Sequence, residues 1–117
     1  MTFVTKLDFL SGLGYHPART RGAGPVYLIS DLGQFDFANG QMRLISYHAG
    51  TTPEKIQKRT RFKLDIAPDL METPAPSEDE LHLLRNKIDP LNIRRLELLS
   101  GSARRQLLRE ILVQESI

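Results

Sequence analysis

Residues 26–47 read VYLISDLGQFDFANGQMRLISY, and this stretch decides the fold. It contains Asn39-Gly40, a dipeptide that favours the positive φ angles required at both central positions of a type I′ turn. Apolar and polar residues alternate on either side of the dipeptide, which is typical of half-buried strands. The stretch therefore predicts a tight antiparallel hairpin over residues 35–46.

The start of the same stretch has a different pattern, because Val26 to Ser30 is a nearly continuous apolar run. Such a run predicts a strand that is covered on both faces. Gly33 follows it and predicts a bend or bulge between this strand and the hairpin.

The N-terminal residues predict a strand followed by a long loop. Phe3, Leu7 and Phe9 are four and two residues apart, so in a strand they would lie on one side, with the charged residues Lys6 and Asp8 opposite. Residues 11–25 hold four glycines and two prolines, which predicts a loop, and loops of this length are often functional.

A short helix and then a connector are predicted after the hairpin. The segment TTPEKIQKRT over 51–60 offers Thr51 as N-cap and Glu54 as its capping-box partner. Residues 65–80 carry six acidic residues, no basic residue and three prolines. This composition predicts an extended connector on the surface.

The last third of the chain predicts helices. Ser77 and Glu80 form a capping box for an amphipathic helix over 78–88. The dipeptide Asp89-Pro90 should break this helix, because proline lacks the backbone N–H that a helix interior needs.

Two further helical segments are expected after this break. Residues 90–99 predict about two turns, with Gly101 as the C-cap residue. Ser102 is then the expected N-cap of a final helix. One face of that helix is apolar and consists of Leu107, Leu108, Ile111 and Leu112.

Strands first and helices last predict an α+β fold, a small mostly antiparallel sheet with a hairpin followed by amphipathic helices. We expect no complete βαβ unit. At 117 residues the chain is long enough for one domain. Its predicted parts are a strand-rich segment over 1–66, a Pro-rich acidic connector over 67–77 and a helical tail over 78–117.

Composition excludes several function classes. The chain has no cysteine, which removes disulfide frameworks and thiolate chemistry and fits a reducing compartment. No apolar stretch approaches the roughly 20 residues that span a bilayer. Lys6 and Asp8 interrupt the apolar N-terminal segment, so it does not resemble a secretory signal. We expect a cytoplasmic protein that does not bind membranes.

The three histidines predict no metal site. His16, His48 and His82 are far apart, and none has a second ligand at metal-binding spacing. His48 follows the hairpin and is expected to be a strand-end or turn residue. No nucleophile motif such as GxSxG occurs either.

Two carboxylates flanked by apolar residues are the remaining candidates for chemistry. Asp31 is expected to bond its own backbone at a strand end, and Asp36 to lie on the solvent side of the hairpin. The sequence therefore predicts no catalytic residue in this chain.

The segment RTRGAGP over 19–25 is a candidate for phosphate binding. Arg21, Gly22 and Gly24 could hold a phosphate through backbone N–H groups. However, neither GxGxxG nor GxxxxGK[ST] is present. A flexible turn that leads into the next strand explains the glycines equally well.

Basic residues concentrate near the C-terminus, at Arg94, Arg95, Arg104, Arg105 and Arg109. They are expected to be a solvated helix face that pairs with acidic residues, here those of the 65–80 connector. With a net charge of +2 and few aromatic residues, nucleic-acid binding is not expected.

The segment from Val26 to Ile66 resembles the last part of the β-subunit of family I CoA-transferases, of the glutaconate and 3-oxoacid type. In that family a T-D-L-x-x-F-like strand end leads to a hairpin, a short helix and a Thr-x-Phe-x-Leu-like segment. KLDFLSGLGY upstream and DPLNIRRLE downstream are similar to the flanking family segments. The matching positions are Ser30, Asp31, Leu32, Phe35, Arg43, Leu44, Gly50, Thr51, Glu54, Thr60, Phe62 and Leu64.

The resemblance implies the C-terminal part of the CoA-transferase α/β fold, in an enzyme that moves CoA between an acyl-CoA and a carboxylate. A CoA thioester would be the substrate of the complete enzyme, with no cofactor in this chain. Ala49 stands where the family often has Pro, and Ser30 where it often has Thr. The S-E-N-G-like motif of the family's catalytic glutamate has no match here, so the isolated chain is expected to be inactive.

The partners implied are a CoA-transferase partner subunit or further copies of the chain. Two alternatives remain open at this point. One is a non-catalytic interaction or oligomerisation module derived from the same fold, and the other is a small basic nucleic-acid binder. Salt-dependent retardation of DNA or RNA would distinguish the latter.

Overall fold

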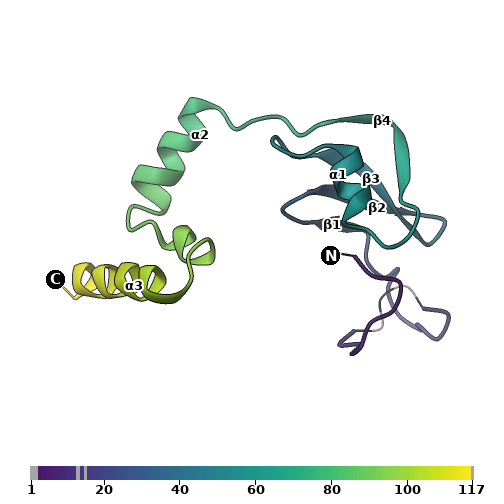
Figure 1. Cartoon of the computed structure of the whole chain (residues 1–117), viewed down its shortest axis with the longest axis horizontal. Helices are drawn as coiled ribbons and strands as arrows, with labels where there is room; N and C mark the ends of the chain where they lie inside the picture. The colour runs from purple at the N-terminus through teal and green to yellow at the C-terminus, as the bar shows by residue number, and fades with distance from the viewer. Residues whose placement is uncertain (1–2, 13, 15, 117) are drawn as a thin grey trace. The chain divides into compact units, whose positions relative to one another are not determined.

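A computed structural model of the chain describes residues 3–12, 14 and 16–116 (Figure 1). They divide into two compact units, residues 1–75 and 76–117. The prediction of one domain over 1–117 stays a prediction, and each unit is described by itself. The first unit contains β1 (Tyr27–Ile29), β2 (Gly33–Ala38), β3 (Gln41–Tyr47), α1 (Pro53–Lys58) and β4 (Asp65–Glu72).

The first unit is a four-stranded sheet in the order β1-β2-β3-β4. β1 pairs with β2 and β2 with β3 in antiparallel fashion, whereas β3 and β4 are parallel. The mixed α and β composition with a mostly antiparallel sheet confirms the predicted fold class. Because α1 connects two parallel strands, β3-α1-β4 is a βαβ unit, and the expectation that none would be complete is wrong.

The hairpin of β2 and β3 is confirmed. Asn39 and Gly40 have φ angles of 53° and 75°, and Ala38 pairs with Gln41 across the two-residue loop. Positive φ at both loop positions is the geometry that the Asn-Gly pair favours.

The core of this unit forms around the hairpin. Phe35 and Leu44 pair directly across the strands, and both are fully buried, as is Ile56 of α1. The ring of Phe3 packs edge-on against Phe35, with 5.2 Å between ring centroids. Leu32 and Leu64 complete the cluster of buried residues.

Gly33 is required by a close approach of two strands. A Cβ at this position would lie 2.3 Å from the backbone oxygen of Ser46. One residue after Gly33, between Gln34 and Phe35, the pairing register of β2 against β3 shifts. The predicted irregularity near Gly33 is therefore present as a bulge inside the hairpin.

The prediction that the first strand is covered on both faces is wrong for the described residues. β1 is an edge strand with one neighbour, and Tyr27 and Ile29 are 69% and 70% exposed. An apolar run favours a buried strand, but no described segment packs over these side chains.

The N-terminal strand prediction is also wrong beyond its first residue. Phe3 forms a single parallel bridge with Thr60, whereas Leu7 and Phe9 are exposed and belong to no strand. Alternation alone does not make a strand where no partner strand is present to satisfy the backbone. The described part of 11–25 contains no helix or strand, as predicted, and Leu13 and Tyr15 lie outside the described residues.

The N-cap of α1 is Thr52 rather than Thr51. Its hydroxyl accepts a hydrogen bond from the backbone N–H of Lys55 at 3.3 Å, and Pro53 occupies the first turn. The expected capping box of Thr51 and Glu54 is therefore not formed, because the helix begins one residue later and places Lys55, which has no acceptor for a backbone N–H, at the N3 position.

Half of the predicted connector is a strand. β4 pairs with β3 at Asp65 and Ile66 and again at Met71 and Glu72, with a large irregularity in between. Pro68 lies inside that irregularity of an edge strand, where its missing N–H breaks no regular ladder. This is why a Pro-containing acidic segment can still form a strand.

The second unit contains α2 (Glu78–Leu83), the π-helical turn η1 (Leu84–Ile88), the 3-10 helix η2 (Ile93–Glu97) and α3 (Gly101–Glu115). The capping box at the start of α2 is confirmed: Glu80 N–H donates to Ser77 Oγ, and Ser77 N–H donates to the Glu80 carboxylate. The backbone hydrogen bond lowers the pKa of Glu80.

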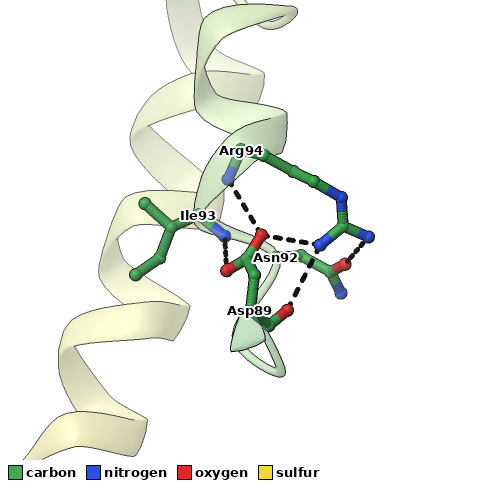
Figure 2. Close-up of polar contacts among 4 residues, drawn as sticks. All are labelled: Asp89, Asn92, Ile93 and Arg94. Carbon is green, nitrogen blue, oxygen red and sulfur yellow. Dashed lines mark hydrogen bonds and ion pairs between the residues drawn. The ribbon is translucent and has the colours of Figure 1, made fainter. Parts of the chain in front are cut away.

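The predicted break at Asp89-Pro90 is confirmed, and Asp89 organises it (Figure 2). Its carboxylate accepts hydrogen bonds from the N–H groups of Ile93 and Arg94 and from the Arg94 guanidinium at 2.6 Å. Burial raises the pKa of Asp89, but these hydrogen bonds outweigh it and leave the pKa below its usual value. Arg94 therefore has a local acidic partner and not the predicted one in the 65–80 segment.

The start of α3 differs from the prediction. Ser100 is the N-cap residue, and Gly101, with φ of 59°, opens the helix instead of ending the previous one. Ser102 consequently lies in the first turn. On the predicted apolar face only Ile111 is buried, while Leu108 and Leu112 are 42% and 52% exposed.

Replacing Gly33 by Ala should lower the free energy of unfolding by about 2 kcal/mol or more, because the new methyl group overlaps the Ser46 carbonyl. Urea unfolding followed by far-ultraviolet circular dichroism measures this change, since the chain has no Trp. Gly12→Ala is the matched control, because a Cβ there meets nothing within 4 Å. Equal stability of both variants would contradict the close approach.

Candidate functional site

Three segments of the first unit line an open groove with a volume of about 520 Å³. They are the turn over 30–33 between β1 and β2, the turn over 48–51 after β3, and α1. Backbone hydrogen bonds close the turns, from Ser30 N–H to Gly33 O at 3.0 Å and from Thr51 N–H to His48 O at 3.1 Å. A third, from His48 N–H to Leu32 O at 3.0 Å, ties the two turns together.

The groove is lined by more positive than negative charge. Lys55, Lys58 and Arg59 come from α1 and the residue after it, and Asp31 is the single carboxylate. Residues three and four positions apart share one helix face, so the three cations project from the same side. Among the residues that the structure describes, the two ion pairs are Asp36–Arg43 and Asp89–Arg94, and neither involves the groove.

Gly50 shapes the turn that forms one wall. Its φ angle is +87°, and a Cβ there would meet no atom within 4 Å. Positive φ at the third position of a four-residue turn is the type II pattern, which requires glycine. The wall beside Gly50 is therefore backbone, with Ala49 as its small side chain.

His48 lies at the end of β3, as predicted, and holds two other segments. Its Nε2–H donates to the backbone carbonyl of Ser30 at 2.9 Å, since a carbonyl can only accept. In the neutral ring Nδ1 is then the acceptor for the Thr73 hydroxyl at 2.9 Å. Thr73 Oγ1 also lies 3.1 Å from Ser46 Oγ, so the imidazole joins the start of the β1–β2 turn to the residue after β4.

Asp36 is a structural residue of the hairpin. Its carboxylate accepts two hydrogen bonds from the Arg43 guanidinium, at 2.9 and 2.6 Å, and the two residues are opposite each other in the register. The hydrogen bond from Arg43 is the largest cause that lowers the pKa of Asp36. This pairing agrees with the predicted position of Asp36 on the polar face of the hairpin.

Asp31 is the predicted candidate that the structure places in the groove. It is exposed, and its side chain makes no hydrogen bond within the described part of the chain. The bond expected between Asp31 and its own backbone is absent, since Ser30 Oγ instead accepts from the N–H of Leu32 at 3.2 Å. Asp31 thus projects a free carboxylate at the groove.

The residues predicted to hold a phosphate lie elsewhere. Arg21 and Gly22 are exposed, and Gly22 and Gly24 have φ angles of 71° and 82°. Arg19 closes this loop by donating to the carbonyls of Gly14 at 2.9 Å and Arg21 at 3.2 Å. None of these residues lines the groove, and phosphate binding by Arg21, Gly22 and Gly24 stays a prediction.

The basic cluster was missed by sequence reasoning. The signal was the K-x-x-K-R spacing over 55–59, which places three cations on one helix face. Asp31, on the opposite side of the groove, is 24 residues before Lys55 in the sequence, so only the fold reveals the groove. Within residues 3–12, 14 and 16–116, no group of three His, Asp or Glu side chains is placed to hold a metal ion.

Among the same described residues, no helix combines the length and the apolar character needed to cross a bilayer.

No protein-family model matches the chain. Individual proteins do match it, and the sequence and structure comparisons point to the same group of enzymes. The IpdB subunit of the cholesterol ring-cleaving hydrolase of Mycobacterium tuberculosis strain H37Rv is 37% identical over an alignment of 106 positions, which covers 84% of this chain and 42% of that protein. The B subunit of the glutaconate CoA-transferase of Acidaminococcus fermentans is 30% identical over 98 residues, 75% of this chain and 36% of that protein.

Solved structures agree with these sequence matches. The structure of Rhodococcus jostii IpdAB matches with a TM-score of 0.67 and 29% identity, over 85% of this chain and 42% of that one. Glutaconate CoA-transferase of Acidaminococcus fermentans matches with a TM-score of 0.53 and 31% identity, over 58% of this chain and 26% of that one. This chain belongs with the B subunits of the family I CoA-transferases.

The sequence resemblance to this family is therefore confirmed, and the match corresponds to a C-terminal portion of such a subunit. The chain spans about two fifths of the length of its IpdB relatives. The family includes different reactions, because a decarboxylase, AibA/AibB, matches as well, with a TM-score of 0.54 and 33% identity over 68% of this chain and 30% of that one.

Acid should weaken the hairpin through Asp36. Because the folded-state pKa of Asp36 lies below its unfolded value, the pair with Arg43 stabilises the fold above about pH 4 and is lost as the pH falls through the lowered pKa. In the Asp36→Asn variant, the free energy of unfolding should therefore fall less steeply as the pH is lowered below about 4. Asp8→Asn, which removes the same charge from an exposed loop, should leave that pH dependence unchanged, and an identical effect of both would refute the assignment.

Replacing His48 by Phe should lower the free energy of unfolding by about 1–3 kcal/mol, because the Ser30 carbonyl and the Thr73 hydroxyl lose their shared partner. Amide hydrogen exchange should quicken at the end of β4, which the imidazole tethers. His16→Phe, in an exposed loop, is the control. Unchanged exchange after His48→Phe would show that the tether has no energetic role.

Proposed function

We propose that this chain forms the non-catalytic C-terminal portion of the B subunit of an enzyme that acts on CoA thioesters. The observation that carries the proposal is the 37% identity over 106 residues, supported by the match to the IpdAB structure with a TM-score of 0.67. The likeness covers both units of the chain, since 84% of its residues align.

The chain's own residues support a structural role within such an enzyme. No S-E-N-G-like segment occurs in the 117 residues. Glu54, in the helix beside the groove, has its pKa lowered by a hydrogen bond from its own backbone N–H and by the Thr52 hydroxyl. A carboxylate stabilised in this way is suited to helix capping rather than to attack on a thioester.

CoA transfer between an acyl-CoA and a carboxylate is the reaction that we assign to the complete protein. Subunits named for this reaction, of the 3-oxoadipate and glutaconate enzymes, are 34% and 30% identical to the chain. A CoA thioester is then the substrate, and no resident cofactor is needed. The cytoplasm is the compartment that we propose, consistent with the absence of cysteine.

Hydrolytic ring cleavage, the reaction named for the IpdB relatives, is the second candidate. It is favoured by the higher identity to the IpdB subunits and by the higher TM-score of IpdAB. Because members of one fold carry different reactions, fold similarity alone does not select between these two.

A partner subunit completes the proposed enzyme. IpdAB and AibA/AibB are each named as a pair of components, and the chain matches one member of such assemblies. The exposed apolar side chains of the edge strand β1 and the residue before it, Val26, Tyr27 and Ile29, support such an assembly, because an uncovered edge strand readily pairs with another chain.

The proposal is tested with a chimera. The matching portion of Rhodococcus jostii IpdB is replaced by this chain and co-expressed with IpdA. Size-exclusion chromatography reports assembly, and chromatography of CoA esters separates hydrolysis from transfer to added carboxylates. We expect a stable complex, whereas this chain alone should give neither reaction.

The control is a chimera that carries Gly33→Ala, which should give less complex because the hairpin is destabilised. Failure of the unmodified chimera under conditions where native IpdAB assembles would contradict the B-subunit assignment. Turnover by the isolated chain would contradict the non-catalytic role.

A further inference from the structure

We propose that the groove between α1 and the turns over 30–33 and 48–51 binds the phosphate groups of a small organic molecule. Lys55, Lys58 and Arg59 are the binding side chains, and the backbone wall beside Gly50 admits the ligand. Nothing in the proposed function requires this site, since it lies on residues that the structural role does not use.

The net charge of the groove favours a phosphate ligand. Three cations face one carboxylate, so the groove has an excess of two positive charges, which suits a phosphate monoester or a diphosphate better than a single carboxylate. The Arg guanidinium forms a planar fork that matches phosphate oxygens, and Lys adds point charges. No described carboxylate forms an ion pair with these three side chains.

The three cations do not contribute to holding α1 on the sheet unit. α1 is held by its buried face, through Ile56, and by the hydroxyl of Thr52. The side chains of Lys55, Lys58 and Arg59 are exposed and donate no hydrogen bond within the described residues. Like charges at this spacing repel one another, which disfavours the helix unless an anion is bound.

Hydrogen bonds fix the backbone around the three cations. Phe3 N–H donates to the Arg59 carbonyl at 3.1 Å, and Arg61 N–H donates to the Phe3 carbonyl at 3.0 Å, which fixes the end of α1. The opposite wall is fixed by the bond from His48 N–H to Leu32 O. The cations thus extend from a defined frame and not from a loop.

The volume of the groove indicates a ligand larger than free phosphate. A volume of about 520 Å³ is within the roughly 300–1,000 Å³ of small-molecule sites and exceeds the needs of one phosphate. Asp31 offers an acceptor for a hydroxyl or amino group on the organic part. The nucleotide end of a CoA thioester and a free nucleoside diphosphate share this chemistry, and only the CoA assignment rests on the proposed function.

Isothermal titration calorimetry of the full chain at low salt tests the site with three probes, inorganic diphosphate, ADP and CoA. We expect Lys55→Gln/Lys58→Gln/Arg59→Gln to weaken ADP binding by about tenfold or more, since charge-assisted hydrogen bonds are lost. The matched control, Arg104→Gln/Arg105→Gln/Arg109→Gln, removes the same charge from α3 and should leave binding within about twofold. Circular dichroism checks that both variants fold.

Asp31→Asn provides an independent readout. Removing the one negative charge should tighten inorganic diphosphate by about threefold, because repulsion at the groove is relieved. A merely structural role of the three cations would not produce this opposite effect. Unchanged or weaker diphosphate binding by Asp31→Asn would contradict the position of the anion beside Asp31.

Each result either identifies the ligand, as CoA or as a general nucleoside diphosphate, or rejects the site. Tighter binding of CoA than of ADP identifies the CoA nucleotide, and equal binding identifies a general nucleoside diphosphate site. No binding of any probe, equal loss in the control, or tighter groove-dependent binding of an RNA oligonucleotide overturns the proposal. An assembled, active chimera with no phosphate binding would reject this site alone, whereas phosphate binding with a failed chimera would reject only the proposed function.

Discussion

The direct pairing of Phe35 with Leu44 across the hairpin is the constraint on which the sheet unit depends. Both side chains are fully buried and come from strands joined by a two-residue turn, so their contact forms with little loss of chain entropy. Phe3 and Ile56 then pack on the cluster that contains this pair. The N-terminal segment and α1 are therefore both anchored on the buried pair of the hairpin.

The groove of this unit lies at the ends of the same strands. The groove is built where β1 turns into β2 and where β3 leaves the sheet, and one backbone hydrogen bond joins these two turns. His48 connects them further to the residue after β4. A polar network at the edge of an apolar core thus fixes the walls beside which the α1 cations stand.

Two apolar surfaces of the described chain agree with the partner that we propose. The apolar edge strand β1 and the apolar residues of α3 remain exposed within the described chain. Such surfaces normally lie against other protein segments. The relatives, whose names include a hydrolase, transferases and a decarboxylase, show that this portion accompanies different chemistry.

The sequence alone determined the local structure that rests on short-range chemistry: the Asn39-Gly40 turn, the Ser77–Glu80 capping box and the break at Asp89-Pro90. It also carried the family resemblance. Only the tertiary structure decided that Val26 to Ile29 lies at an edge, that the acidic segment through Pro68 pairs with β3, and that Asp31 lines the same groove as the α1 cations. These depend on which strands find partners and which distant turns meet, and neighbouring residues in the chain contain no information about either.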